Sequence, residues 1–353
     1  MSSPFAQLTL ARIREFIREP EALFWVYGFP LLMATALGIA FRNQPVEQIR
    51  VDVVQAASAE GQVDTGPLAA LTREPRFVVT RGDEPAARRR LRGGKTDVVV
   101  IASVGGSAER PFVYLYDFSR KESTLARNAV EDAVQRAAGR RDAFTAEDRN
   151  FDEPGGRYID FLVPGLLGMS LMGGGLWGVG YVIVDMRIRK LLKRFLATPM
   201  PRSHFLAAIL ASRLLFLLPE VLVLLVFARF AFGVQSQGGV AGVLVFILLG
   251  AIAFAGIGLL VASRARTLES VSGLMNLVML PMWVLSGIFF SSDRFPAAVQ
   301  PFIKLLPLTM AIDGLRGVMI DGLAAWSQPR ELFGLAIWAT VSFALALRFF
   351  RWH

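Results

Sequence analysis

The chain has 353 residues, of which 54% are hydrophobic and 19% are charged, and its formal net charge is +9. So apolar a composition, with a mean hydropathy of +0.47, excludes an ordinary soluble globular protein and is typical of a polytopic membrane protein. The sequence has no cysteine and two histidines, His204 and His353. These counts exclude disulfides and cysteine nucleophiles and argue against a histidine-based metal centre.

The charge is unevenly distributed along the chain. Residues 45–155 hold 17 Lys/Arg and 18 Asp/Glu, whereas the remainder holds 21 and 11. The basic excess therefore belongs to the hydrophobic part of the chain. There it indicates membrane topology rather than nucleic-acid binding.

Residues 1–20 are predicted to form an amphipathic helix on the cytoplasmic leaflet. Its apolar face consists of Leu10, Ile13, Phe16 and Ile17, and Arg14 and Arg18 lie on another face. The first membrane helix is expected over residues 21–43. A cleaved signal peptide is the alternative, because Gly38-Ile39-Ala40 is a small-x-small site, but the apolar run is longer than a signal peptide needs.

Residues 44–156 are predicted to form a small extracytoplasmic α/β domain. Its strands are expected at "QIRVDVV", "RFVVT", "KTDVVVIAS" and "PFVYLYDF", which are rich in β-branched residues. Helices are expected at "DEPAARRRLRGG" and, with an apolar face of Leu125, Ala129, Ala133 and Ala137, at "SRKESTLARNAVEDAVQRAAGRR". Arg88–Arg90 could bind an anion, but the neighbouring acids favour a solvated helix face.

Residues 157–353 hold five further runs long enough, or nearly so, to cross a bilayer. They are Tyr158–Val184, Phe205–Phe232, Val240–Ala262, Val271–Phe290 and Leu332–Leu347. Between the last two, residues 294–322 are apolar but interrupted by charges and prolines, which favours an external re-entrant hairpin over a span. The predicted fold class is a polytopic α-helical membrane protein of six transmembrane helices with a small extracytoplasmic α/β domain.

The short loops carry their Lys and Arg on one side of this arrangement. Six such residues lie in 185–204, two in 263–270 and three in the N-terminal segment. The positive-inside rule then places both termini in the cytoplasm of a multi-pass protein of the cell (inner) membrane.

Motifs for catalysis are absent from the sequence. It contains no G-x-x-x-x-G-K-[ST], no G-x-S-x-G and no H-E-x-x-H pattern, so we expect no catalytic residue, no metal site and no cofactor bound by this chain. The "GGG" at 173–175 indicates close helix packing. Uphill transport would then need energy from a partner or an ion gradient.

Glu220 lies near the middle of the third span, where burial of an acid is costly. It could contact a substrate or carry a proton. Alternatively, it could pair structurally with Arg213, two turns earlier in the same span. The residues alone leave these alternatives open.

The basic loop between the second and third spans is predicted to contain an amphipathic helix over residues 187–198. Its apolar face consists of Ile188, Leu191, Leu192, Phe195 and Leu196, and its other faces carry Arg187, Arg189, Lys190, Lys193 and Arg194. Without interleaved aromatic residues it is not expected to bind nucleic acid. It could transmit force from a cytoplasmic protein or anchor at anionic lipid.

Two long stretches resemble the type-2 exporter permeases of the ATP-binding-cassette (ABC) transporters. "RKLLKRFLATPMPRSHFLAAILASRLL" resembles their first cytoplasmic loop, in which a coupling helix precedes an L-x-x-T-P motif, here Leu196-Ala197-Thr198-Pro199. "LMNLVMLPMWVLSGIFFSSDRFPAAVQPFIKLLPLTMAIDGLRGVMIDG" is similar to their fifth span and external hairpin. The segment 1–20 resembles their connecting helix, and 44–156 the external domain of one exporter branch. Many members begin the coupling helix with R-E-x-G-T-x-E, whereas this chain has Asp185-Met186-Arg187-Ile188-Arg189-Lys190.

The resemblance implies a permease subunit of an ATP-driven exporter for an amphiphilic, drug- or lipid-like substrate. Two separate ATPase subunits would carry ATP and Mg, and a second permease copy or a paralogue would complete the complex. The residues implied in contact with the ATPase are Arg187, Arg189, Leu191, Leu192, Phe195, Leu196, Thr198, Pro199, Arg264, Arg266 and Glu269. Candidates for the translocation path are Glu220, Arg213, Asn276, Asp313 and Arg316. The alternatives are a membrane receptor with an external sensor domain and an ion-coupled transporter.

Overall fold

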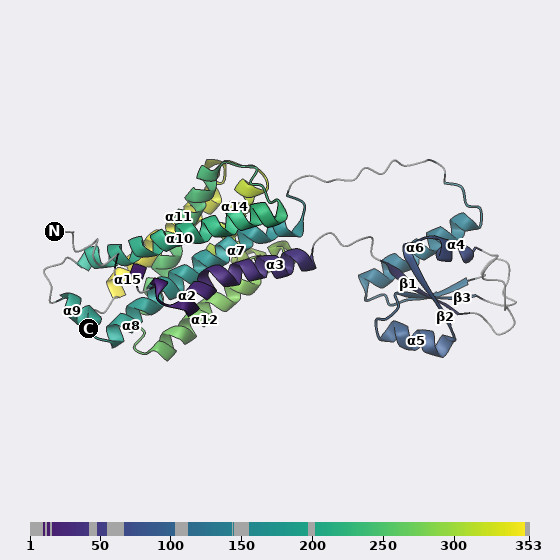
Figure 1. Cartoon of the computed structure of the whole chain (residues 1–353), viewed down its shortest axis with the longest axis horizontal. Coiled ribbons are helices and arrows are strands. Elements are labelled where there is room, and N and C mark those ends of the chain that lie inside the picture. The colour runs from purple at the N-terminus through teal and green to yellow at the C-terminus, as the bar shows by residue number, and fades with distance from the viewer. Residues whose placement is uncertain are drawn as a thin grey trace. The chain divides into compact units, whose positions relative to one another are not determined.

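The computed structural model describes residues 10, 13–14, 16–41, 48–54, 67–102, 112–142, 144, 155–196 and 202–349, without the side chains of 195–196 and 202–203. Contacts divide the chain into two compact units. Residues 1–43 and 151–353 form a helical unit, and residues 44–150 form a smaller unit with a sheet (Figure 1).

Six helices are long and apolar enough to cross a membrane, in agreement with the six predicted spans. They are Pro20–Ala40, comprising α2 (Pro20–Leu23), η1 (Phe24–Gly28) and α3 (Phe29–Ala40); Tyr158–Ile188, comprising α7 (Tyr158–Gly175), η3 (Leu176–Tyr181) and α8 (Val182–Ile188); His204–Phe232 within α10 (Arg202–Phe232); α11 (Val240–Ala262); α12 (Leu268–Leu285); and α15 (Pro329–Phe349). The fifth span ends before the predicted Phe290, because the chain turns at Gly287 with φ +79°.

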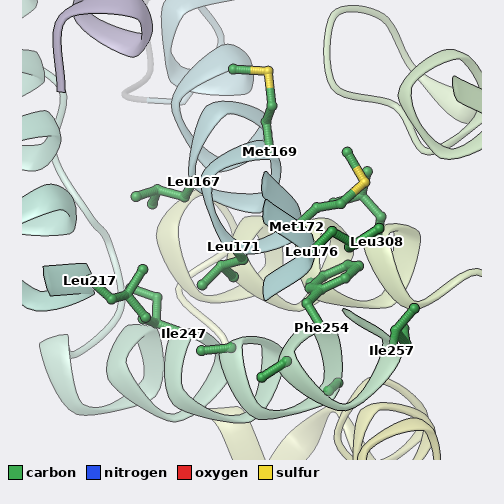
Figure 2. Packing of buried hydrophobic residues seen from close by; sticks show 14 of the residues in the cluster. Leu167, Met169, Leu171, Met172, Leu176, Leu217, Ile247, Phe254, Ile257 and Leu308 are labelled. Atoms are coloured by element: carbon green, nitrogen blue, oxygen red, sulfur yellow. The ribbon is translucent and has the colours of Figure 1, made fainter. Parts of the chain in front are cut away.

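The core of the helical unit is the crossing of the second span with α11. A β-carbon added at Gly175 would lie 2.4 Å from the carbonyl carbon of Phe254, and one added at Gly258 would lie 2.3 Å from the carbonyl oxygen of Gly175. The backbones therefore touch, as the glycine-rich sequence predicts. Around this crossing, Met172 and Leu176 pack beside Phe254 (Figure 2).

Residues 292–327 form short elements rather than a seventh span. They are η4 (Ser292–Arg294), α13 (Gln300–Ile303), α14 (Pro307–Met319) and η5 (Ala325–Ser327). The helix α14 packs against α7, α11 and α15. Its last carbonyls are satisfied by the loop between α10 and α11, since the amides of Gln237 and Gly238 donate to Met319 and Val318 at 2.9 Å each.

Most of the predicted helix over residues 1–20 lies outside the described residues. Leu10, residues 13–14 and residues 16–17 are helical. The ring of Phe16 lies 4.3 Å from that of Phe216 on α10. The N-terminal segment is thus held against the third span by an aromatic contact, and its position on a leaflet stays a prediction.

The smaller unit is built on a four-stranded sheet with strand order β2-β1-β3-β4. The strands are β1 (Ile49–Val54), β2 (Phe77–Gly82), β3 (Val98–Ala102) and β4 (Phe112–Leu115), and the helices are α4 (Ala69–Arg73), α5 (Glu84–Arg92) and α6 (Lys121–Ala137). Strand β1 runs parallel to β2 and β3, whereas β4 is antiparallel to β3. The four strands and two longer helices agree with the prediction, and α4 is an addition.

The buried face of α6 agrees only in part with the predicted one: Ala133 is buried and Ala129 packs against the core, but Ala137 is exposed. Leu125 is 68% exposed, whereas Ala126 and Val130 are buried and pack against the sheet. Two neighbouring stripes of α6 have helical spacing, and the stripe with the branched valines is the one that the sheet covers. On α5, the exposed pair of Arg88 with Glu84 supports the solvated-face alternative for Arg88, whereas Arg90 is half-buried and pairs with the buried Asp52 of β1.

The glycine crossing gives a test with a matched control on the same helix. We expect Gly175→Ala to lower the free energy of unfolding by about 1–3 kcal/mol, because overpacking forces the two backbones apart. Gly173→Ala should be neutral or slightly stabilising, since no atom lies within 4 Å of an added β-carbon there. Thermal unfolding in detergent, followed by tryptophan fluorescence, checks this; equal melting temperatures of the two variants would contradict it.

Candidate functional site

The loop after the second span is divided into two helices. The helix α8 ends at Ile188, Lys190 adopts φ +60°, and α9 covers Leu191–Leu196. The predicted continuous helix over 187–198 is therefore wrong at its start. The apolar spacing runs on across the turn at Lys190, so periodicity alone could not detect the break.

The short helix α9 presents its apolar side to the protein and its basic side outward. Leu192 is only 2% exposed and packs against the core of the helical unit, and Leu191 is half-buried. Lys193 and Arg194 are exposed. Ile188, which was predicted on the same apolar face, is 43% exposed because it lies before the turn.

The side chains of four implied contact residues are not described by the structure. Phe195 and Leu196 complete α9, but only their backbone is described. Thr198 and Pro199 lie outside the described residues. The roles implied for these four residues therefore stay predictions.

Arg187 joins the two loops at this end of the bundle. Its Nη1 donates hydrogen bonds to the carbonyl oxygens of Ala262, at 3.0 Å, and Ala265, at 2.9 Å. These carbonyls lie at and just beyond the C-terminus of α11, where a cation is also favoured by the helix dipole. Arg187 thus ties α8 to the loop between α11 and α12, and this structural role was missed in the sequence.

The loop between α11 and α12 adds further cations beside this tie. Arg264 and Arg266 are exposed, and Glu269 is exposed in the first turn of α12. Thr267 caps α12 by accepting a hydrogen bond from the amide of Ser270 at 3.1 Å. We call the exposed cations of the two loops the basic surface; it consists of Lys190, Lys193, Arg194, Arg264 and Arg266. Arg189 also points outward but pairs with Asp185 at 2.9 Å.

A buried ion pair lies deep in the third span. The Nη2 of Arg213 lies 2.9 Å from Oε2 of Glu220, and it also lies 3.4 Å from the carbonyl oxygen of Ser170 on α7. Both side chains are buried. The structure thus agrees with the alternative in which Glu220 pairs with Arg213. Participation of this pair in transport stays a prediction.

Glycine makes the room for this arginine. A β-carbon at Gly174 would lie 1.6 Å from Nη2 of Arg213, and one at Gly178 would lie 3.1 Å from its Cδ. The glycines of α7 and η3 therefore have two uses: Gly175 admits the α11 backbone, whereas Gly174 and Gly178 admit the guanidinium. From the sequence, the glycine run indicated close helix packing but not the room for Arg213.

The other path candidates lie elsewhere. Arg316 on α14 stacks 3.5 Å from the ring centroid of Phe161 and donates from Nη2 to the carbonyls of Phe161, at 3.2 Å, and Gly287, at 2.5 Å. It fastens the hairpin to α7 and to the end of α12. Asp313 is half-buried nearly one turn earlier, and Asn276 is exposed on α12. The structure brings Arg213 and Glu220 together but places Arg316 in a separate cluster.

Six apolar spans, a short packed hairpin and a basic loop surface define a polytopic helical membrane protein. The family model described as "ABC-2 family transporter protein" matches residues 20–348, and the chain belongs to this family. It is therefore a permease-type membrane component, the part of such a transporter that does not carry out catalysis.

Three bacterial relatives illustrate the similarity. The linearmycin resistance permease protein LnrN of Bacillus subtilis is 25% identical over 49% of this chain and 45% of LnrN. The inner membrane transport permease YadH of Escherichia coli is 30% identical over 47% of this chain and 64% of YadH. The probable multidrug ABC transporter permease YbhS of E. coli is 20% identical over 89% and 88%. The chain thus spans less than two thirds of the length of LnrN and of YadH.

The buried ion pair predicts an asymmetry between single and double substitutions. Arg213→Met should lower the free energy of unfolding by about 3 kcal/mol, because it leaves Glu220 buried without its cation. The double variant Arg213→Met with Glu220→Leu should recover most of this loss, since both side chains are then apolar. Thermal unfolding of both variants checks this. A double variant as unstable as the single one would contradict the pairing. A double variant that folds but does not transport would show that the pair also functions in transport.

The tie made by Arg187 predicts a local effect. Arg187→Ala should destabilise the protein by about 1–2 kcal/mol and speed hydrogen exchange in residues 263–267, because two carbonyls at the end of α11 lose their donor. Arg189→Ala, which removes an exposed pair one turn away, should cost about 0.5 kcal/mol or less. Hydrogen exchange read by mass spectrometry distinguishes them; unchanged exchange in Arg187→Ala would refute the tie.

Proposed function

We propose that the chain is the membrane-spanning permease subunit of an ATP-driven exporter. It works with two separate ATPase subunits, which bind ATP and Mg, and with a second copy or a paralogue of itself. The observation that carries the proposal is the basic surface. Its cations lie on two loops, and the hydrogen bonds of Arg187 hold these loops together, so that they form one docking area. Membership in the ABC-2 family supports an ATPase as the partner.

The geometry of α9 supports a mechanical role. This helix follows the second span after a single left-handed residue, Lys190, and its Leu192 is packed into the core. Force on the exposed side of α9 would therefore reach α8 and η3. From there it would reach α11 through the glycine crossing, because the backbones at Gly180 and Gly258 leave no side chain to yield between them.

The orientation follows from the same charges. The basic surface lies at the end of the bundle that we assign to the cytoplasm, by the positive-inside rule. Both termini are then cytoplasmic, and residues 44–156 are extracytoplasmic. We assign the protein to the inner membrane because its relative YadH is named an inner membrane transport permease.

For the substrate we propose an amphiphilic, drug- or lipid-like compound. The relatives LnrN and YbhS are named for linearmycin resistance and for probable multidrug transport. The exposed apolar faces of α10 and α12, which include Leu222 and Leu277, would give such a compound a route from the lipid to the protein. Reconstitution of the complex with candidate compounds of this class tests the assignment.

Charge reversal on α9 tests the docking surface. In a complex with its ATPase, Lys193→Glu combined with Arg194→Glu should weaken association at least about tenfold, because two exposed cations face the partner. Stimulation of ATP hydrolysis should fall with it. Lys304→Glu, on the exposed surface of the hairpin, is the control and should leave both unchanged. Association and hydrolysis that survive the double reversal would refute the docking assignment.

A further inference from the structure

A pocket opens between α11, α12 and α15 at the end of the bundle that carries the basic surface. Its volume is about 240 Å³. Its walls are apolar and include Leu260 and Val261 of α11, Leu274, Leu277 and Val278 of α12, and Phe349 of α15. The helix α15 packs along α11, so α11 forms the floor between the other two helices.

One cation stands at the mouth of this pocket. The guanidinium of Arg264 lies 4.9 Å from the ring centroid of Phe349, and Arg264 itself lines the pocket. Its side chain is exposed, and no carboxylate pairs with it in the part of the chain that the structure describes. The pocket therefore combines a free positive charge at its outer end with an apolar interior.

The residues that line the pocket lie within one leaflet's depth of the basic end of α12. Leu277 and Val278 follow the first residue of α12 by nine and ten residues, which is roughly 14 Å along a helix axis. The hydrocarbon core of a bilayer is about 30 Å thick, so these residues lie in the half of it that is nearer to the basic surface. An acyl chain whose headgroup lies beside Arg264 would fill the apolar part.

We propose that this pocket binds an anionic phospholipid of the leaflet that contacts the basic surface. One acyl chain lies against Leu274, Leu277 and Phe349, and the phosphate accepts hydrogen bonds from Arg264. A second protein copy is a poorer occupant, because an apolar face that covered Arg264 would bury its charge without a partner. The proposal needs only a membrane-embedded chain and can be tested without the ATPase, although Arg264 also belongs to the basic surface.

The absence of cysteine from the sequence makes a clean probe possible. Leu277→Cys in the full chain, labelled with bimane and placed in nanodiscs, reports quenching by brominated lipids. Leu280→Cys is the matched control, because Leu280 is exposed on the same helix but does not line the pocket. Brominated phosphatidylglycerol and brominated phosphatidylcholine are compared at equal mole fractions.

We expect about a fivefold preference for phosphatidylglycerol at Leu277→Cys, the worth of one basic side chain near an anionic headgroup. No preference is expected at Leu280→Cys. Arg264→Gln should abolish the preference, and Arg266→Gln, in the same loop, should retain it. Equal quenching by both lipids at Leu277→Cys, or a preference lost as readily in Arg266→Gln, would overturn the proposal. The proposal would also be overturned if neither lipid quenched the label at Leu277→Cys. That result is expected if a second copy of the chain covers the pocket.

Discussion

The contact of backbone with backbone between the second span and α11 is the constraint on which the helical unit depends. Lipid tails are as apolar as leucine, so helices in a membrane gain little from burying apolar side chains and associate through close packing instead. Gly175, Gly180 and Gly258 allow that approach. The helices α14 and α15 then pack on α11, and α10 packs on α7.

Cations near the apolar core follow a common rule in this protein. Arg187, Arg213 and Arg316 each direct the guanidinium at backbone carbonyls of a different element. For Arg187 and Arg316 these carbonyls include ones at or just beyond a helix end; such a carbonyl and an arginine are both costly in an apolar setting, and each satisfies the other. These three arginines therefore hold the elements together, whereas the exposed cations of the loops after α8 and after α11 form the basic surface. That division separates residues that build the bundle from residues that can meet a partner.

Features that depend on composition could be predicted from the sequence, whereas features that depend on tertiary contacts could not. Apolar runs of about 20 residues identified all six spans, because the bilayer thickness fixes that length. Helical spacing could not choose the buried face of α6, since the sheet selects Ala126 and Val130 over the neighbouring stripe with Leu125. The turn at Lys190 was hidden because the apolar spacing continues across it. The tie made by Arg187 was hidden because its acceptors, Ala262 and Ala265, are distant in sequence. The glycine run was recognised as a packing motif, but its room for Arg213 requires the third span in place.

Site-specific photocrosslinking in the native membrane tests the central claim most directly. A photoreactive amino acid replaces Lys193 on the basic surface in one strain and Lys304 on the hairpin in another; both positions are exposed. The account predicts a crosslink to an ABC ATPase subunit from position 193 and none from position 304. Crosslinks from position 193 to lipid alone, or to an ATPase from position 304, would contradict it.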